Sequence, residues 1–142
     1  MGSINFELFA GTIEVSVIIE SASGGDFRNV MAVLDTGAAV SVIPTRLALE
    51  LGYDLSKADQ VEFVSATDVE CRPLINVRSL TAIKETVSDI EVVCRDLPRS
   101  CLDSDEDSEA EALLGLNFLC HFNVNINFRT LNEGSIELYK RT

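Results

Sequence analysis

The stretch Val33-Leu34-Asp35-Thr36-Gly37-Ala38 decides the expected fold of this chain of 142 residues. It places an acidic residue directly after apolar residues typical of a buried strand, where a carboxylate is costly unless it is paired or hydrogen-bonded. Gly37 allows a sharp turn and a close approach of the backbone to that carboxylate. Thr36 offers a hydroxyl for a bond to a neighbouring backbone group. The stretch predicts a partly buried carboxylate in a tight loop, although an ordinary turn between strands has a similar sequence.

The residues before this stretch predict a β-hairpin that ends at Asp35. Residues 13–19 are rich in Val and Ile, and Val15, Val17 and Ile19 fall on one face of a strand. Residues 23–26 read Ser-Gly-Gly-Asp, which is a turn signal. Residues 28–34 then form a return strand.

The residues after it predict further short strands and little helix. Residues 40–43 are a β-branched run, and a short helix is expected from Pro44 to Leu51, with Leu47 and Leu51 on one face and Gly52 as its stop. Strands are expected at residues 61–65, 71–83, 87–93, 123–128 and 136–139, and a helical turn at residues 116–120. Pro73 predicts that part of its strand lies at an edge. Many short strands with regular turns indicate an all-β sandwich or barrel.

Two segments at the expected separation resemble the retropepsins, the retroviral and retroviral-like aspartic proteases. The first is two apolar residues followed by Asp35-Thr36-Gly37-Ala38, the β-branched run and the short helix. The second is Leu113-Leu114-Gly115-Leu116-Asn117-Phe118-Leu119, which is similar to the family's second signature. The closing residues 122–139 resemble the hairpin found in cellular and bacterial members. The resemblance covers residues 13–138 in the family's order.

The resemblance implies a closed, barrel-like β domain with one or two short helices that acts as a homodimer. Asp35 corresponds to the catalytic aspartate, Thr36 to the residue whose hydroxyl bonds the partner loop, and Gly37 to the glycine of that loop. Gly115 corresponds to the glycine of the second signature, a structural role beneath the active site. One domain is expected over residues 1–142, with a terminal segment at 1–10 and an acidic loop at 103–111.

Substrate contacts are expected from Ala38 and from a flap at residues 65–70, with Ala66, Thr67 and Asp68 at its tip. This tip departs from the family pattern because it contains no glycine, although Asp68 tolerates turn conformations. In members with Ser or Thr at the position of Ala38, the hydroxyl can donate a hydrogen bond that favours a charged carboxylate, and Ala38 cannot. We therefore expect a less acidic pH optimum than that of pepsin-like enzymes.

Peptide hydrolysis by this route needs two carboxylates, one to take a proton from water and one to protonate the carbonyl oxygen. The chain has a single Asp-Thr-Gly, so two copies of Asp35 must meet at a two-fold axis. The expected function is an aspartic endopeptidase without a cofactor or metal. Two alternatives are a catalytically inactive dimerisation or peptide-binding module on the same fold, and an unrelated, monomeric β domain with a chance motif.

Composition disfavours two classes of partner, which leaves the second copy and the peptide or protein substrate that the resemblance implies. The net charge of −12 disfavours nucleic acid, and no apolar run is long enough to span a membrane. Six acidic residues gather in a segment expected to be a solvated loop, since its spacing does not fit a calcium loop: Asp103, Asp105, Glu106, Asp107, Glu109 and Glu111. The four cysteines lack metal-site spacing, and without a secretory signal we expect reduced thiols and a cytoplasmic location.

Overall fold

The computed structural model describes residues 1–8, 11–64, 69–97 and 109–141, which form two β-sheets and three short helical segments. Six strands close into a barrel in the order β2-β3-β8-β4-β7-β6, because β6 also pairs with β2. Their bounds are Glu14–Glu20 (β2), Phe27–Leu34 (β3), Ala112–Leu114 (β8), Ser41–Ile43 (β4), Glu85–Cys94 (β7) and Val69–Ala82 (β6). The strand β5 (Asp59–Val64) lies outside this ring and, among the described strands, pairs with β6 alone. The expected all-β barrel is confirmed.

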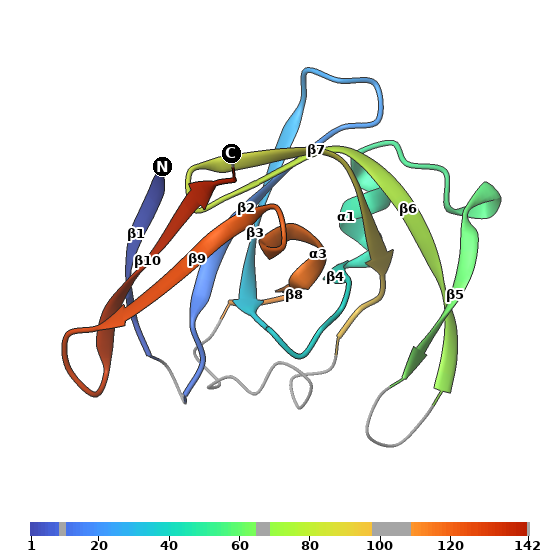
Figure 1. Ribbon diagram of the computed structural model, residues 1–142. Helices are drawn as coiled ribbons and strands as arrows, with labels where there is room; N and C mark the ends of the chain where they lie inside the picture. The colour runs from blue at the N-terminus through green and yellow to red at the C-terminus, as the bar shows by residue number, and fades with distance from the viewer. Residues whose placement is uncertain (9–10, 65–68, 98–108, 142) are drawn as a thin grey trace.

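A separate three-stranded sheet joins the two ends of the chain in the order β1-β10-β9 (Figure 1). Its strands are Gly2–Glu7 (β1), Glu133–Lys140 (β10) and Phe122–Phe128 (β9). No strand was predicted within residues 1–10, which were expected to be a terminal segment, although the residues from Ile4 to Leu8 alternate between apolar and polar. β1 exists as a strand because it pairs antiparallel with β10 from Gly2↔Leu138 to Glu7↔Glu133.

The hairpin of β2 and β3 carries the alternation that the sequence predicts. Val15, Val17 and Ile19 are at most 2% exposed and face the main core. Gly24 and Gly25 both adopt positive φ in the connecting turn, a conformation that glycine reaches without steric cost. Burial of each such aliphatic side chain stabilises the fold by roughly 1.5 to 3 kcal/mol.

The helical segments are short and lie beside the barrel strands. The helix α1 (Thr45–Glu50) buries Leu47, and Leu51 follows on the same face, as predicted. Gly52 ends the helix with a φ of 83°, as its sequence position indicates. The other two segments are η1 (Leu55–Lys57) and α3 (Leu116–Leu119). The predicted helical turn after Gly115 is therefore confirmed.

The strand β6 changes neighbours along its length. From Leu74 to Ala82 it pairs with β7, but residues 69–73 pair with β5 only. Pro73 lies in this second part, which confirms the edge position predicted for it. The paired β5 and early β6 extend away from the barrel on the right of Figure 1.

Candidate active site

Asp35 follows β3 directly and is held by the neighbouring parallel strand. β3 pairs with β8 up to Leu34↔Leu114, and the Asp35 N–H then donates to the Leu114 carbonyl oxygen at 3.0 Å. The preceding Ala32 and Val33 are buried, whereas Asp35 is half-buried. The carboxylate therefore stands at the end of a buried strand with part of its surface open, as the sequence predicted.

The loop after Asp35 turns back onto the carboxylate. The Gly37 N–H donates to Asp35 Oδ1 at 2.9 Å, and the Ala38 N–H donates to the Asp35 carbonyl oxygen at 3.2 Å. A Cβ on Gly37 would lie 3.2 Å from Oδ1, and Gly37 is not among the residues with positive φ. Close approach to the carboxylate, rather than left-handed backbone, is what favours glycine here. Thr36 and Gly37 are both exposed.

The loop at Gly115 is joined to the Asp35 loop by backbone hydrogen bonds. The Leu116 N–H donates to the Ala38 carbonyl oxygen at 2.8 Å, and the Asn117 N–H donates to that of Ala39 at 3.1 Å. A Cβ on Gly115 would lie 2.7 Å from the Ala38 carbonyl oxygen, closer than real Cβ atoms approach. Glycine at position 115 therefore allows the two loops to meet.

A buried serine and an asparagine complete this connection. Ser41, which is 1% exposed, accepts a hydrogen bond from the Gly115 N–H at Oγ and donates its own hydroxyl to Asn117 Oδ1, both at 2.9 Å. Asn117 also accepts from the Ser41 N–H and donates through Nδ2 to the Glu91 carbonyl oxygen. Sequence reasoning assigned no role to either side chain. The available signal was one polar residue inside the β-branched run of residues 40–43.

An open cleft of about 460 Å³ begins at Asp35. Its walls come from the Asp35 loop, β5, β6, β7 and β8, and most of the lining residues are apolar: Ala38, Ala39, Val40, Val61, Val64, Leu74, Val93 and Leu113, with Gly37 and Glu62. Val33, Val42, Val93, Ala110 and Leu113 form a small buried cluster of their own in the same region. The cleft therefore combines the carboxylates of Asp35 and Glu62 with a mostly apolar surface, a composition typical of ligand-binding pockets.

The comparisons with known proteins agree with this geometry. A family model described as aspartyl protease matches residues 15–118. The chain belongs to the aspartyl protease family. A search of curated proteins found no match. Among solved structures, a retropepsin-like aspartic protease from Rickettsia conorii is similar, with 18% sequence identity and a TM-score of 0.64 over 97% of this chain and 91% of that one.

The structural similarity shows that this aspartyl protease has a retropepsin-like fold, as the two sequence signatures predicted. Both signatures, around Asp35 and Gly115, lie within the matched residues or the aligned structure. Of the residues predicted to contact substrate, Ala38 lines the cleft. Ala66, Thr67 and Asp68 lie outside the described residues, between β5 and β6.

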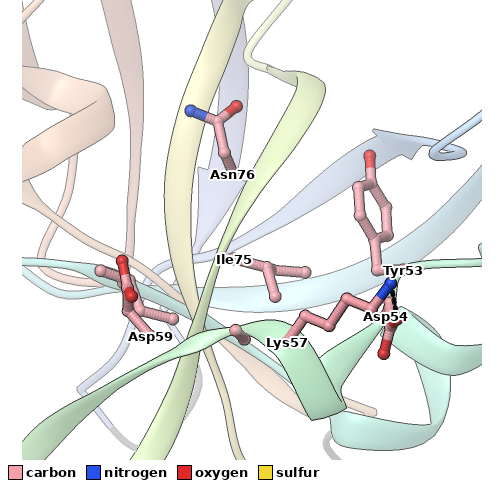
Figure 2. A pocket seen from close by; sticks show the side chains of 8 residues that line it. Tyr53, Asp54, Lys57, Asp59, Ile75 and Asn76 are labelled. Carbon is pink, nitrogen blue, oxygen red and sulfur yellow. Dashed lines mark ion pairs between the residues drawn. The ribbon is translucent and has the colours of Figure 1, made fainter.

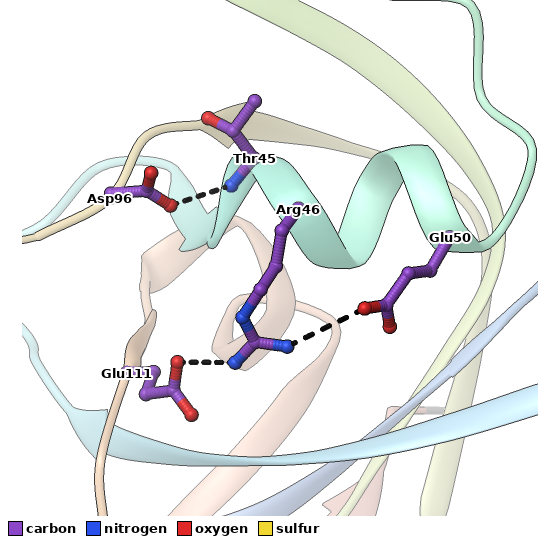
Figure 3. A network of polar contacts seen from close by, with 5 residues as sticks. All are labelled: Thr45, Arg46, Glu50, Asp96 and Glu111. Carbon is purple, nitrogen blue, oxygen red and sulfur yellow. Dashed lines mark hydrogen bonds and ion pairs between the residues drawn. The ribbon is translucent and has the colours of Figure 1, made fainter.

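The acidic cluster of this aspartyl protease is only partly described. Asp103, Asp105, Glu106 and Asp107 fall outside the described residues, and Glu109 is exposed. Figure 3 shows how the flanking residues attach to α1. The Thr45 N–H donates to Asp96 Oδ1 at 3.1 Å, and Arg46 pairs with both Glu111 and Glu50. The hydrogen bond to Glu111 raises the pKa of Arg46.

A second hollow of about 290 Å³ lies at η1 and the middle of β6 (Figure 2). Two of its charged residues, Asp54 and Lys57, interact with each other or with their sequence neighbours. Asp54 accepts hydrogen bonds from the Ser56 N–H and hydroxyl, which lower the pKa of Asp54, and Lys57 lies 4.0 Å from the same carboxylate. Because Asp35 does not line this hollow, we assign the chemistry to the cleft at Asp35.

The cysteines show no sign of a metal or redox centre in the described parts of the chain. Cys71, Cys94 and Cys120 are free thiols, and burial raises the pKa of Cys94 to about 11. Cys101 lies outside the described residues. Among the residues that the structure describes, no three His, Cys, Asp or Glu side chains gather as metal ligands. No helix within them is long and apolar enough to cross a membrane.

Proposed function

We propose that this chain is an aspartic endopeptidase in which two copies of Asp35, one from each protomer of a homodimer, activate a water molecule. The observation that carries this proposal is the half-buried Asp35 carboxylate, fixed by the Gly37 N–H at the head of an apolar cleft. Membership in the aspartyl protease family supports it. The chain supplies one Asp-Thr-Gly only, so the second carboxylate must come from a second copy.

The exposed surface around Asp35 supports a partner of the same sequence. Thr36 and Gly37 are exposed beside the carboxylate, in positions that a two-fold related loop can cover. The edge strand β9 pairs with β10 alone among the described strands, and its Val124, Ile126 and Phe128 are 37 to 60% exposed. An unpaired strand edge with apolar side chains favours association.

In the proposed mechanism the two Asp35 carboxylates share one proton, because like charges at short distance do not both ionise easily, as is known for aspartic proteases as a class. The charged carboxylate takes a proton from water, and the protonated one donates to the carbonyl oxygen as the water oxygen attacks the carbonyl carbon. The carboxyl group that took the proton from water then donates it to the leaving nitrogen as the C–N bond breaks. A hydroxyl group of the intermediate returns its proton to the other carboxylate, which restores the shared proton. The Gly37 N–H remains on Oδ1 and orients each carboxylate.

The proposed substrate is an extended peptide or protein segment. The cleft lies between the Asp35 loop and the β5–β6 hairpin, and its apolar lining accepts side chains on both sides of the scissile bond. A role for Ala66, Thr67 and Asp68 in holding the peptide from above remains part of this proposal.

The experiment that tests it measures cleavage of a diverse peptide mixture between about pH 3 and pH 8, which spans the titration of a carboxylate pair. We expect cleavage by the natural chain, its loss in Asp35→Asn, and a steep fall of specific activity on dilution below the dimer dissociation constant. Asp35→Asn should keep the fold and the dimer by circular dichroism and sedimentation. An activity maximum below about pH 3 would contradict the expectation drawn from Ala38.

A folded dimer that cleaves no peptide would instead support the inactive peptide-binding module. A monomer at all concentrations would contradict the shared site altogether.

A further inference from the structure

The hairpin above the cleft leaves the barrel at a defined point. The ladder between β6 and β7 ends at Leu74↔Val93, and both of these residues line the cleft at Asp35. Beyond Leu74, residues 69–73 have β5 as their only strand neighbour in the part of the chain that the structure describes. Within the described residues, no ladder of backbone hydrogen bonds therefore fixes the distance between this part of the hairpin and the barrel.

An ion pair between two side chains crosses this gap. Arg95, two residues past Val93, donates from Nη2 to Oε1 of Glu70 at 2.9 Å. Glu70 lies four residues before Leu74, on the part of β6 that has separated from β7. The contact joins the hairpin to the barrel beside the cleft.

The two ends of this contact differ in their surroundings. Arg95 is 7% exposed, and its N–H donates to the Ile43 carbonyl oxygen, so its backbone belongs to the barrel. The Glu70 side chain is 23% exposed and also accepts from Arg72 Nε at 2.6 Å, along the same strand. The hydrogen bonds from Arg72 and then Arg95 lower the pKa of Glu70, so Glu70 stays charged to a lower pH than an ordinary glutamate does.

A buried guanidinium needs a compensating partner, and loss of that partner is strongly unfavourable. The planar guanidinium also fixes the direction of its hydrogen bonds more closely than an ammonium group does. The Glu70 carboxylate therefore has a preferred position relative to Arg95, and the strand that carries it is held in the same place.

We propose that Arg95 and Glu70 are positioning residues that set the distance between the β5–β6 hairpin and the floor of the cleft. This inference rests on the proposed protease function for its kinetic consequence, but the contact itself also has a consequence in the inactive protein. Neither residue reacts with substrate. They act by keeping Val61, Val64 and Leu74 at the separation from Asp35 that a bound peptide needs.

Arg72 provides a matched control, because it also bonds Glu70 but lies on the same strand and does not cross the gap. The first measurement is backbone hydrogen exchange in the Asp35→Asn background, which prevents cleavage. We expect Arg95→Gln to raise exchange in residues 59–64 and 69–72 about tenfold over Arg72→Gln, with β2 and β3 unchanged, since local opening reports local contacts.

The second measurement is peptide cleavage by the same variants with Asp35 intact. We expect Arg95→Gln and Glu70→Ala each to raise KM about fivefold with kcat within about twofold, the pattern of lost uniform binding. The double variant should resemble the single ones, because both changes remove one contact. Arg95→Lys should restore part of the loss.

Equal exchange in Arg95→Gln and Arg72→Gln would overturn the inference, and so would additive effects on KM in the double variant. Should Arg95→Gln not fold, Glu70→Ala carries the same test, because it removes the partner from the hairpin side. If the natural chain cleaves nothing, the proposed function fails while the exchange comparison still decides the role of Arg95.

Discussion

The loop that carries Asp35 and the hairpin that faces it are held by different kinds of interaction. The Asp35 loop is fixed by backbone and buried side-chain hydrogen bonds to Leu114, Leu116 and Asn117. The hairpin beyond Leu74 is tied to the barrel by the Glu70–Arg95 ion pair. The Asp35 carboxylate, which we propose to be catalytic, is thus placed by groups that do not titrate, whereas the position of the hairpin depends on an ion pair whose carboxylate does.

The largest effect on stability should come from filling the contact between the two loops. Gly115→Ala places a methyl group 2.7 Å from the Ala38 carbonyl oxygen and should lower the free energy of unfolding by about 3 kcal/mol. Urea unfolding at fixed protein concentration measures it. The control Gln60→Ala, on exposed β5, should change it by under about 0.5 kcal/mol. Similar losses in the two variants would mean that the Gly115 contact is not a rigid one.

A smaller loss is expected from Ser41→Ala. This change removes the acceptor of the Gly115 N–H and a donor to Asn117, and leaves a buried N–H unpaired at a cost of about 2 kcal/mol. The matched control is Ser16→Ala, because Ser16 also donates to an asparagine side chain but on an exposed surface. We expect under about 0.5 kcal/mol there. An equal effect of both changes would contradict a special role for Ser41.

The smallest effect should be a change in the pH dependence of Tm when Glu70, on the β5–β6 hairpin, is replaced. The folded pKa of Glu70 lies below its ordinary value, so its ion pairs stabilise the fold above that ordinary value and lose this effect as pH falls through the folded pKa. Between pH 7 and about pH 3.5, the Tm of Glu70→Gln should therefore fall by about 1 to 2 °C less than the Tm of the natural chain does. Gly115→Ala should show the natural pH dependence. If the Tm of Glu70→Gln fell with pH as much as that of the natural chain, Glu70 would not contribute to the acid sensitivity of the fold.

The sequence alone predicted many of the strands and turns of this protease and identified its candidate aspartate. Alternation identified the strands around Val15 and Val87, and the glycines at 24, 25 and 52 marked turns that the structure confirms with positive φ. The motif at Asp35 predicted a tight loop, and the hydrogen bond from Gly37 to the carboxylate agrees with it. These features succeed because they depend on residues close together in the chain.

Other features were decided only by tertiary structure. β8 is a strand because β3 and β4 pair with it, since its own residues, Ala-Leu-Leu, do not alternate. β1 alternates through Ile4 and Phe6, but it is its pairing with β10 that places it in a sheet. The bond from Ser41 to Asn117 joins residues 76 positions apart, and no local pattern announces it. The same holds for Arg95 and Glu70. Local sequence fixes which residues alternate and where the chain turns, whereas the packing of distant strands decides which polar groups meet, because only the closed barrel brings them together.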